Sequence, residues 1–314
     1  MHDAGVFLLD HVRPILKWAG GKRQLLPELR PFYPRRFQRY FEPFLGSGAV
    51  FLDLHNTGRL GRAQVRLSDI NADIIGCYRA VRDTPGEVIR ALRALETRYK
   101  SGGAALFYDV RDREFNPARR ALQDDPAAGY TPALAAMLIF LNRTGFNGLF
   151  RVNARGEFNV PAGRYGNPKI CDEANLRAWS AVLANPRVSL EVSTFDTALK
   201  RAGEDDFVYL DPPYAPLSGT ARFTSYTAGG FDGIKQEELQ RTVIALASRG
   251  ASVLLSNSAA PQIRALYAGR GAARTAGLRA TTVAARRAIN SRAASRGPVR
   301  EYLITNVPRC KLAG

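Results

Sequence analysis

The feature that most limits the possible folds is an alternation of short strands and helices that stops and then resumes. A strand is expected over residues 38–45, a helix over 46–56 and a second strand over 65–69, which together make one strand–helix–strand unit. Residues 76–165 read as mostly helical with a long loop, and strands return after about residue 170. A parallel sheet interrupted by a helical insertion explains this order.

The returning pattern predicts the rest of the sheet. Its strands are expected at Val188–Val192, Phe207–Leu210, Ser252–Ser256 and Glu301–Thr305, with a helix over Gln236–Ala247. Within the insertion, residues 87–100 place apolar side chains on one helical face. We therefore predict an α/β fold, a Rossmann-like doubly wound sheet with a mostly helical insertion. Residues 1–75 and 166–314 would form the discontinuous core, and residues 76–165 the insertion.

The charge of the chain indicates a polyanionic partner. Lys and Arg total 45 against 28 Asp and Glu, a formal net charge of +17. Duplex nucleic acid is the commonest such partner, although a basic solvated surface is the alternative. Residues 239–300 hold eleven arginines and no acid, and residues 268–297 read as a basic loop or arm that follows phosphates. The alternative is that this stretch is a surface that tolerates substitution, in which a GC-rich genome has placed Arg and Ala.

Cysteine usage and hydropathy exclude several classes of protein. Cys77, Cys171 and Cys310 are far apart and form no paired motif, so neither a disulfide framework nor a metal site is expected. The longest apolar run, residues 133–141, is far too short to span a membrane. The apolar residues 6–9 are too few for a secretory signal. We expect a cytoplasmic protein without a metal and without a membrane partner.

Two glycine-containing segments are candidate ligand-binding loops. Gly46 and Gly48 follow the first strand and permit close approach of the backbone to a ligand, although Phe51 stands where a dinucleotide fingerprint has a third glycine. Asp69 lies 21 residues past Gly48, where an acid can accept hydrogen bonds from both ribose hydroxyls of an adenosine. A helix N-cap is the alternative role for Asp69.

The second segment, residues 17–22, reads KWAGGK. Trp18 offers a flat apolar face, and Lys22 offers a cation for a carboxylate. Taken alone, an ordinary loop explains these residues about as well.

The most specific motif is Asp211-Pro212-Pro213-Tyr214, directly after the apolar strand 207–210. An exocyclic amino group is a poor nucleophile, because its lone pair is delocalised into the ring. The Asp211 carboxylate and the Pro212 carbonyl can each accept a hydrogen bond from this amino group. Both acceptors then stabilise the positive charge that forms on the nitrogen as it attacks. The prolines stiffen the loop, and Tyr214 offers a ring on which a flipped base can stack. A plain proline-rich turn explains this combination far less well.

These motifs resemble those of the Dam family of DNA adenine N6-methyltransferases, from about Leu16 to Asn306. The matching stretches, in family order, are KWAGGK at 17–22, EPFLGSGAVF at 42–51, SDIN at 68–71, LNRTGFNGLFRVNARGEFNVPAGRY at 141–165, DPPYAPLSGTARFTSY at 211–226 and LLSN at 254–257. The resemblance implies a methyltransferase core that binds S-adenosylmethionine and an insertion that recognises DNA. The Arg/Ala-rich residues 268–282 match none of these motifs.

The resemblance also implies roles for individual residues. Those expected at the cofactor are Trp18, Lys22, Phe44, Gly46, Gly48, Asp69 and Asp211, and those expected in catalysis are Asp211, Pro212 and Tyr214. Those expected to bind DNA are Lys17, Arg143, Phe146, Asn147, Leu149, Arg151 and Pro161. Among them, Arg151 would read a guanine, Leu149 and Pro161 would contact a thymine methyl, and Phe146 would insert near the flipped base.

We therefore expect a monomeric enzyme that methylates adenine in double-stranded DNA, with GATC as its site. It would flip the base and transfer the methyl group directly, in the cytoplasm of a bacterium or of a phage-infected cell, on the nucleoid. Two alternatives keep the fold. One is an exocyclic-amine methyltransferase acting on cytosine N4, RNA or a protein amide, and the other is a non-catalytic DNA-binding protein.

Overall fold

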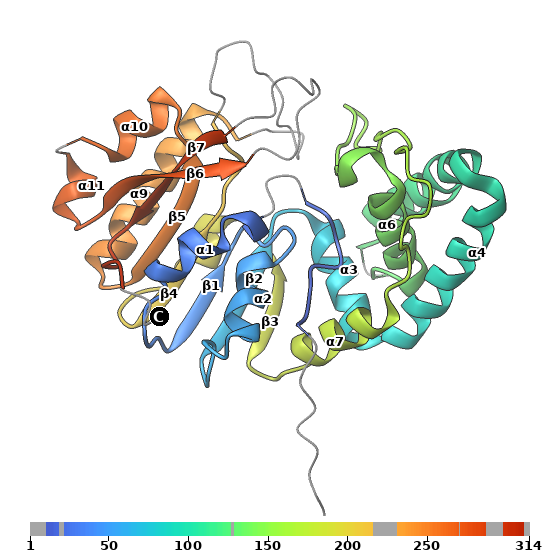
Figure 1. Cartoon of the computed structure of the whole chain (residues 1–314), viewed down its shortest axis with the longest axis horizontal. Coiled ribbons are helices and arrows are strands. Elements are labelled where there is room, and N and C mark those ends of the chain that lie inside the picture. Colours follow the sequence, from blue (N-terminus) through green and yellow to red (C-terminus); the bar gives the residue numbers. More distant parts are fainter. Residues whose placement is uncertain are drawn as a thin grey trace, which may run out of the picture.

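In the part of the chain that the structure describes, seven strands form one mixed sheet (Figure 1). The computed structural model describes residues 11–18, 22–126, 129–215, 231–269, 271–286 and 298–310. The strands are β1 (Arg39–Glu42), β2 (Gln64–Asp69), β3 (Val188–Val192), β4 (Asp206–Leu210), β5 (Ser252–Ser258), β6 (Arg279–Arg286) and β7 (Pro298–Thr305). Their order across the sheet is β3-β2-β1-β4-β5-β7-β6. The first five run parallel, and β7 is antiparallel to both β5 and β6.

Helices connect these strands and form a separate group between β2 and β3. The α-helices are α1 (Leu26–Leu29), α2 (Ala49–Asn56), α3 (Ala72–Asp83), α4 (Pro85–Asp109), α5 (Asn116–Asp124), α6 (Pro132–Thr144), α7 (Glu173–Leu183), α8 (Phe195–Ala198), α9 (Gly233–Ser248), α10 (Pro261–Tyr267) and α11 (Ala272–Thr275). Short 3₁₀ turns are η1 (Lys22–Gln24), η2 (Arg30–Phe32) and η5 (Phe146–Gly148), and η3 (Val110–Phe115) is a π-helix. Among the described helices, none is both long and apolar enough to cross a bilayer.

The central strand β4 shows why both faces of the sheet are covered. All five of its residues are buried. Phe207 and Tyr209 join a core that includes residues of α2, α3 and α7, whereas Val208 and Leu210 join a second core with α9 and α10. Alternate side chains of a strand point to opposite faces, so the two cores lie on the two sides of the sheet. The predicted doubly wound α/β fold is therefore confirmed.

We call α4, η3, α5 and α6 the helical group; it lies beside α3, on the right in Figure 1. Its first core residues include Val88, Leu92 and Leu95 of α4, the apolar face that the sequence predicted. Helix α6 packs against both α3 and α4. The division of the chain into a core and an insertion stays a prediction, and its expected boundary after residue 75 falls inside α3.

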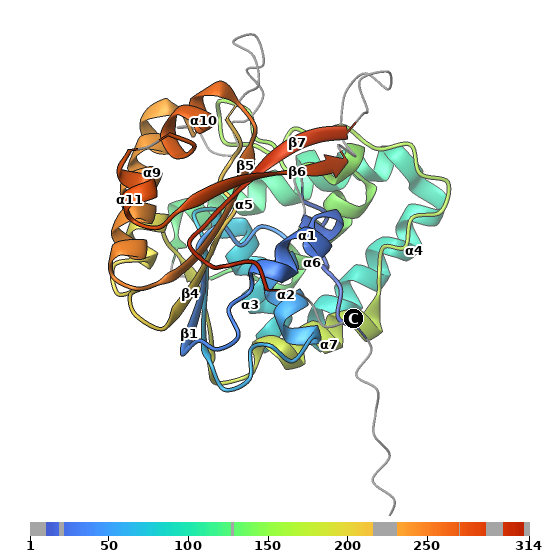
Figure 2. The same cartoon turned by 60° about the vertical axis from the view of Figure 1, so that its left-hand side comes forward.

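One prediction about the C-terminal part was wrong. Within residues 268–297, expected as a basic loop or arm, the structure places α11 and the strand β6, and residues 287–297 lie outside the described part. β6 pairs along its length with β7, and Figure 2 shows the two as a long ribbon. Its sequence is rich in Arg, Ala and Thr, and so lacks the apolar run used to predict strands. Residues 279–284 of this strand are exposed or half-buried, so it needs no such run.

The end of β1 carries a buried acid, Glu42. Its side chain is 3% exposed and accepts hydrogen bonds from the Tyr40 hydroxyl at 2.7 Å and from the Phe51 backbone N–H at 3.0 Å. Burial raises the pKa of Glu42 to about 8, and these hydrogen bonds oppose the rise. Glu42 is therefore mainly protonated at neutral pH and orders the start of α2.

We predict that Glu42→Gln stabilises the protein most at mildly alkaline pH. The unfolded chain releases the Glu42 proton near its ordinary pKa of 4.5, whereas the folded chain retains it up to about pH 8. Wild-type stability should therefore fall as pH rises through this window, by up to about 5 kcal/mol. Glutamine cannot ionise, so urea unfolding should show the variant gaining on the wild type between about pH 5 and pH 8. A gap that stays constant with pH would contradict this account of Glu42.

Candidate active site

The residues singled out by the sequence meet at the carboxyl edge of the parallel strands. Gly46 follows β1, Asp69 ends β2 and Asp211 follows β4. The strand order reverses between β1 and β4, since β2 and β3 lie on one side of this pair and β5 on the other. In open α/β sheets such a reversal opens the crevice in which ligands bind.

The Asp211 carboxylate is held from two sides. Its Oδ1 accepts a hydrogen bond from Ser256 Oγ of β5 at 3.1 Å, and Lys22 Nζ lies 2.8 Å from the same atom. Ser256 in turn lies 3.1 Å from the Tyr209 hydroxyl. Burial raises the pKa of Asp211 above its ordinary value, and the Lys22 cation opposes that rise. These contacts fix the orientation of the carboxylate before any ligand binds.

Side chains from β5 and α9 hold the rest of the loop after β4. Gln236 Nε2 donates to the Pro213 carbonyl at 3.0 Å, and Asn257 Nδ2 donates to Gln236 Oε1 at 3.0 Å. Ser258 Oγ donates to the Ala215 carbonyl at 2.7 Å. The loop is therefore a rigid feature, fixed by its prolines from within and by these hydrogen bonds from outside.

Tyr214 joins this site to the antiparallel strand β7. Its hydroxyl donates to Glu301 Oε2 at 2.6 Å, and its ring centroid lies 4.6 Å from Lys22 Nζ. The side chain is half-buried. The phenol is held at one end and presents a partly accessible ring beside Asp211.

Asp69 is prepared to accept hydrogen bonds. Its two carboxylate oxygens accept the backbone N–H groups of Gly46 at 3.0 Å and of Asn71 at 2.9 Å. Burial raises the pKa of Asp69 to about 6, against the lowering effect of these hydrogen bonds. Asn71 caps α3 by accepting from the Asp73 N–H at 3.0 Å. Its Nδ2 is buried with no partner among the residues that the structure describes.

The surroundings of Asp69 form a cradle that suits an adenosine. Gly46 has φ +47°, and a Cβ on it would lie 2.8 Å from the Trp18 ring, so only glycine fits under that indole. Ile70 leaves 54% of its side chain exposed beside Asp69, an apolar surface suited to a flat ring. Together with the buried donor on Asn71, these groups match a ligand with hydroxyls and an aromatic base.

Two predicted cofactor residues have evident structural contacts. Gly48 has φ +65° at the start of α2, and a Cβ there would lie 3.0 Å from Trp179. Phe44 stacks on Phe195 at 5.6 Å and meets the edge of Phe231 at 5.8 Å. Phe44 is half-buried, so part of its ring remains accessible at the edge of the sheet.

The second predicted group lies on the segment after α6. Residues 145–162 form a hairpin, with isolated antiparallel bridges between Gly145 and Ala162 and between Val152 and Phe158. Phe146 is 42% exposed, Arg151 and Pro161 are exposed, and Asn147 and Leu149 are half-buried. Arg151 Nε donates to Asn159 Oδ1 at 2.8 Å, so its guanidinium is aligned by the opposite arm of the hairpin.

The segment before η1 links the hairpin to the cradle around Asp69. Asn142 accepts from the Lys17 N–H at 2.7 Å and donates to its carbonyl at 2.8 Å, while Lys17 Nζ lies 4.4 Å from the Tyr165 ring centroid. Trp18 stacks on Phe150 with centroids 5.7 Å apart. Trp18 thus contacts both the cofactor cradle and the hairpin.

Arg143 differs from the other predicted DNA-binding residues. Its guanidinium donates to the Ile15 carbonyl at 3.1 Å and to the Pro14 carbonyl at 3.4 Å. Burial lowers the pKa of Arg143 from its ordinary value. These contacts hold the N-terminal segment on α6, and a contact of Arg143 with DNA stays a prediction.

Sequence reasoning missed several residues that build this site. Ser256 and Asn257 stand in the LLSN stretch but received no role, and Gln236 and Glu301 stand in no motif at all. A polar pair that interrupts an apolar strand was the available signal for Ser256 and Asn257, because buried polar side chains need partners. Within the described residues, no group of three or more His, Cys, Asp or Glu side chains is arranged to hold a metal.

Comparison with known proteins gives a consistent result. The family model of the D12 class N6 adenine-specific DNA methyltransferases matches residues 18–282. The type II methyltransferase M1.LlaDCHI of Lactococcus lactis subsp. cremoris is 35% identical over 297 residues, 94% of this chain and 96% of its own. The type II methyltransferase M.MjaIII of Methanocaldococcus jannaschii is 39% identical over 256 residues, 79% of this chain and 84% of its own.

The DNA adenine methylase of Escherichia coli K12 is 37% identical over 245 residues, 78% of this chain and 80% of its own. Among solved structures, the rRNA methyltransferase aviRa of Streptomyces viridochromogenes covers 91% of this chain and 82% of its own. Its TM-score is 0.30 and its identity 13%, so weak a likeness that it adds nothing to the family match.

Proposed function

This chain belongs to the D12 class of N6 adenine-specific DNA methyltransferases, and we propose that it methylates the adenine of GATC in double-stranded DNA. The observation that carries the proposal is the Asp211–Tyr214 loop, held at the carboxyl edge of β4 by Lys22, Ser256 and Glu301. Fixed acceptors beside a half-buried aromatic ring suit an exocyclic amine of a base lifted out of the duplex.

We assign the methyl donor, S-adenosylmethionine, to the cradle formed by Trp18, Gly46, Gly48 and Asp69. Bound there, it would supply a methyl group on a sulfonium sulfur, an electrophile suited to an amine. Asp69 would accept hydrogen bonds from the ribose hydroxyls. Phe44 and Lys22 complete the residues that we assign to this pocket.

The protein's own contribution to the reaction is to hold the adenine amine. Lys22 and Ser256 both contact Oδ1 of Asp211, so we assign Oδ2 to one N6 hydrogen and the Pro212 carbonyl to the other. Both acceptors favour a tetrahedral nitrogen and stabilise the positive charge that develops on it. Tyr214, anchored through Glu301, would stack on the base and align it.

Recognition of the duplex is assigned to the hairpin. Arg151, aligned by Asn159, would donate to a guanine in the major groove, and Leu149 and Pro161 would contact a thymine methyl. Phe146 and Asn147 would lie near the flipped base, and Lys17 would approach the DNA backbone. The net charge of +17 supports binding of this polyanion, and we propose that the enzyme acts as a monomer.

Product analysis tests this function. Plasmid DNA would be incubated with the enzyme and S-adenosylmethionine, digested to nucleosides and analysed by mass spectrometry. N6-methyladenine as the only methylated nucleoside is the expected result. N4-methylcytosine would move the acceptor to cytosine, and tight binding of S-adenosylmethionine and DNA without any product would indicate a non-catalytic binding protein.

The affinity for S-adenosylmethionine should depend on pH through Asp69. Only the ionised carboxylate offers acceptors to both hydroxyls, and the pKa of Asp69 is about 6. The Kd, measured by calorimetry, should be constant above this value and should rise by up to about tenfold per pH unit below it. Asp69→Asn should bind weakly with little pH dependence. A wild-type Kd that does not change down to pH 5 would remove Asp69 from the ribose site.

A further inference from the structure

Three side chains of the helical group bind the backbone of one arm of the hairpin. Arg111 Nη1 donates to the Val160 carbonyl at 2.9 Å. Asn116 donates to the Phe158 carbonyl at 3.0 Å and accepts from its N–H at 2.8 Å. Arg119 Nη1 donates to the Gly156 carbonyl at 2.7 Å. Every second residue of the arm from 156 to 160 is therefore fixed through its main chain.

The π-helix η3 explains how these donors come to share one face. The backbone N–H of Asn116 bonds to the Arg111 carbonyl five residues earlier, so the wider turn brings these two residues into line. Arg119 follows Asn116 by three residues in α5, again on the same side. π-helical turns are rare and are often found at functional sites.

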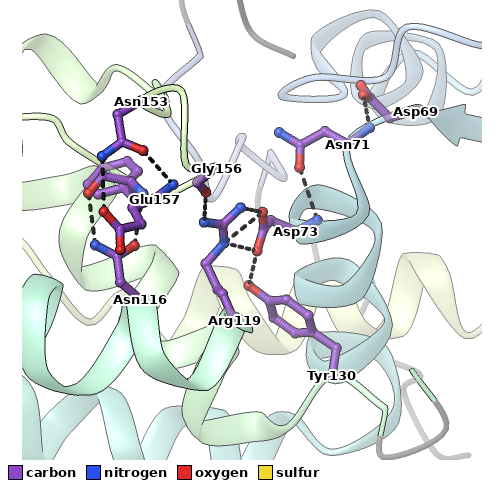
Figure 3. A network of polar contacts seen from close by, with 10 residues as sticks. Asp69, Asn71, Asp73, Asn116, Arg119, Tyr130, Asn153, Gly156 and Glu157 are labelled. Atoms are coloured by element: carbon purple, nitrogen blue, oxygen red, sulfur yellow. Dashed lines mark hydrogen bonds and ion pairs between the residues drawn. The ribbon is translucent and has the colours of Figure 1, made fainter. Parts of the chain in front are cut away.

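Arg119 differs from the other two, because its guanidinium also binds Asp73 of α3 (Figure 3). Its Nε and Nη2 donate to the Asp73 carboxylate, with the shortest contact at 2.7 Å, and the Tyr130 hydroxyl lies 3.4 Å from Asp73 Oδ1. Arg119 and Asp73 are 9% and 8% exposed. This is a buried ion pair whose third arm reaches the hairpin.

The partner of Arg119 lies close to the cofactor cradle. Asp73 is in the first turn of α3, and its N–H is capped by Asn71, whose own N–H donates to Asp69. On the hairpin side, Gly156 closes the turn in which Asn153 Oδ1 accepts the N–H groups of Arg155 and Glu157. A continuous set of hydrogen bonds therefore runs from Asp69 to the turn of the hairpin, as Figure 3 shows.

We propose that Arg119 is a positioning residue for recognition of the DNA sequence. It fixes the 153–157 turn of the hairpin relative to α3 and the cradle around Asp69. The proposal rests on the function proposed for Arg151. Arg119 acts through the turn: it places the arm that carries Asn159, and Asn159 aligns Arg151. A guanidinium suits this task, because its planar fork can bind a carboxylate on one side and a carbonyl on another.

Arg119→Lys tests the proposal, since lysine keeps the charge but lacks the fork. The matched control is Arg120→Lys, because Arg120 pairs from the solvent side with Glu157 of the same turn, with 62% of its side chain exposed. Amide hydrogen exchange at Asn153, Gly156 and Asn159 should accelerate by about tenfold or more in Arg119→Lys, as a fixed turn becomes a locally opening one. It should change little in Arg120→Lys.

The same variants are then compared as enzymes, on the duplex that the wild type prefers and on duplexes with one base pair changed. Arg119→Lys should lose discrimination by roughly tenfold, which is within the range of one base contact. Its affinity for S-adenosylmethionine without DNA should stay close to that of the wild type. Unchanged exchange together with unchanged discrimination would overturn the proposal, as would an equal loss in Arg120→Lys.

Two further experiments distinguish a variant that does not fold, and a proposed function that is wrong, from a failure of this inference. If Arg119→Lys does not fold, the double variant Asp73→Asn/Arg119→Gln leaves no unpaired buried charge and should show the same faster exchange. If the wild type methylates no duplex, the proposed function fails, yet the exchange experiment still tests whether Arg119 fixes the turn. Protected amides in a folded variant would then refute the inference alone.

Discussion

Replacement of Asp211 by asparagine is expected to lower the rate of methyl transfer by about a thousandfold or more. The change removes the negative charge that stabilises the developing charge on N6, and loss of a single preorganised group of this kind costs about 10²–10³ in rate. It also leaves a donor where an acceptor is needed, which misaligns the amine. Single-turnover rates with enzyme in excess over DNA measure this step without product release.

The control for this variant must separate catalysis from stability. Asp211→Asn also removes the charge beside Lys22, which is 5% exposed, and breaking a buried pair costs about 3–5 kcal/mol. Asp206, at the other end of β4, is 1% exposed and pairs with Arg39 at 2.7 Å. Asp206→Asn should also lose stability, although less, because the Arg39 side chain is 37% exposed, and it should retain its rate below its unfolding temperature. A fully active Asp211→Asn would exclude Asp211 from the chemistry.

Replacement of Arg151 by alanine is expected to relax sequence discrimination while leaving the maximal rate largely intact. A bidentate contact with a guanine contributes about 1–3 kcal/mol of discrimination, or roughly 5- to 150-fold in kcat/KM between the preferred duplex and one altered at that base pair. The loss should be confined to that base pair, and the other positions should be read as before. Competition between the two duplexes, each carrying a different label, measures the ratio directly.

Arg155→Ala provides the matched control. Arg155 is exposed in the turn of the same hairpin, so its removal costs the same charge without touching the group assigned to the guanine. Binding should weaken about equally on all duplexes, with a shallower dependence on salt. Equal discrimination by Arg151→Ala and the wild type would remove the assignment of Arg151.

The sequence predicted the parts of the fold that depend on local pattern. The strands at 188–192, 207–210, 252–256 and 301–305 were recovered, because each is a short run rich in Leu, β-branched or aromatic residues. β6 was missed because an edge strand tolerates Arg, Ala and Thr. Its antiparallel pairing with β7 is a tertiary contact, which the local sequence pattern does not encode.

The candidate site likewise contains residues that the sequence predicted and residues that it did not. The loop after β4 and the glycine turn after β1 carry motifs, and the structure brings both to one edge of the sheet. Glu301 and Gln236 could not be predicted, since each acts through a tertiary contact with a residue far away in the chain. The same holds for Arg119, whose partners Asp73 and Gly156 lie 46 and 37 residues away.

Transfer of labelled methyl groups from S-adenosylmethionine tests the central claim most directly. Two short duplexes of equal composition would be compared, one containing GATC and the other with that site scrambled. The account predicts label in the GATC duplex alone, recovered as N6-methyladenine. Equal label in both duplexes would contradict the assigned site, and label in neither would contradict the assignment of duplex DNA as the acceptor.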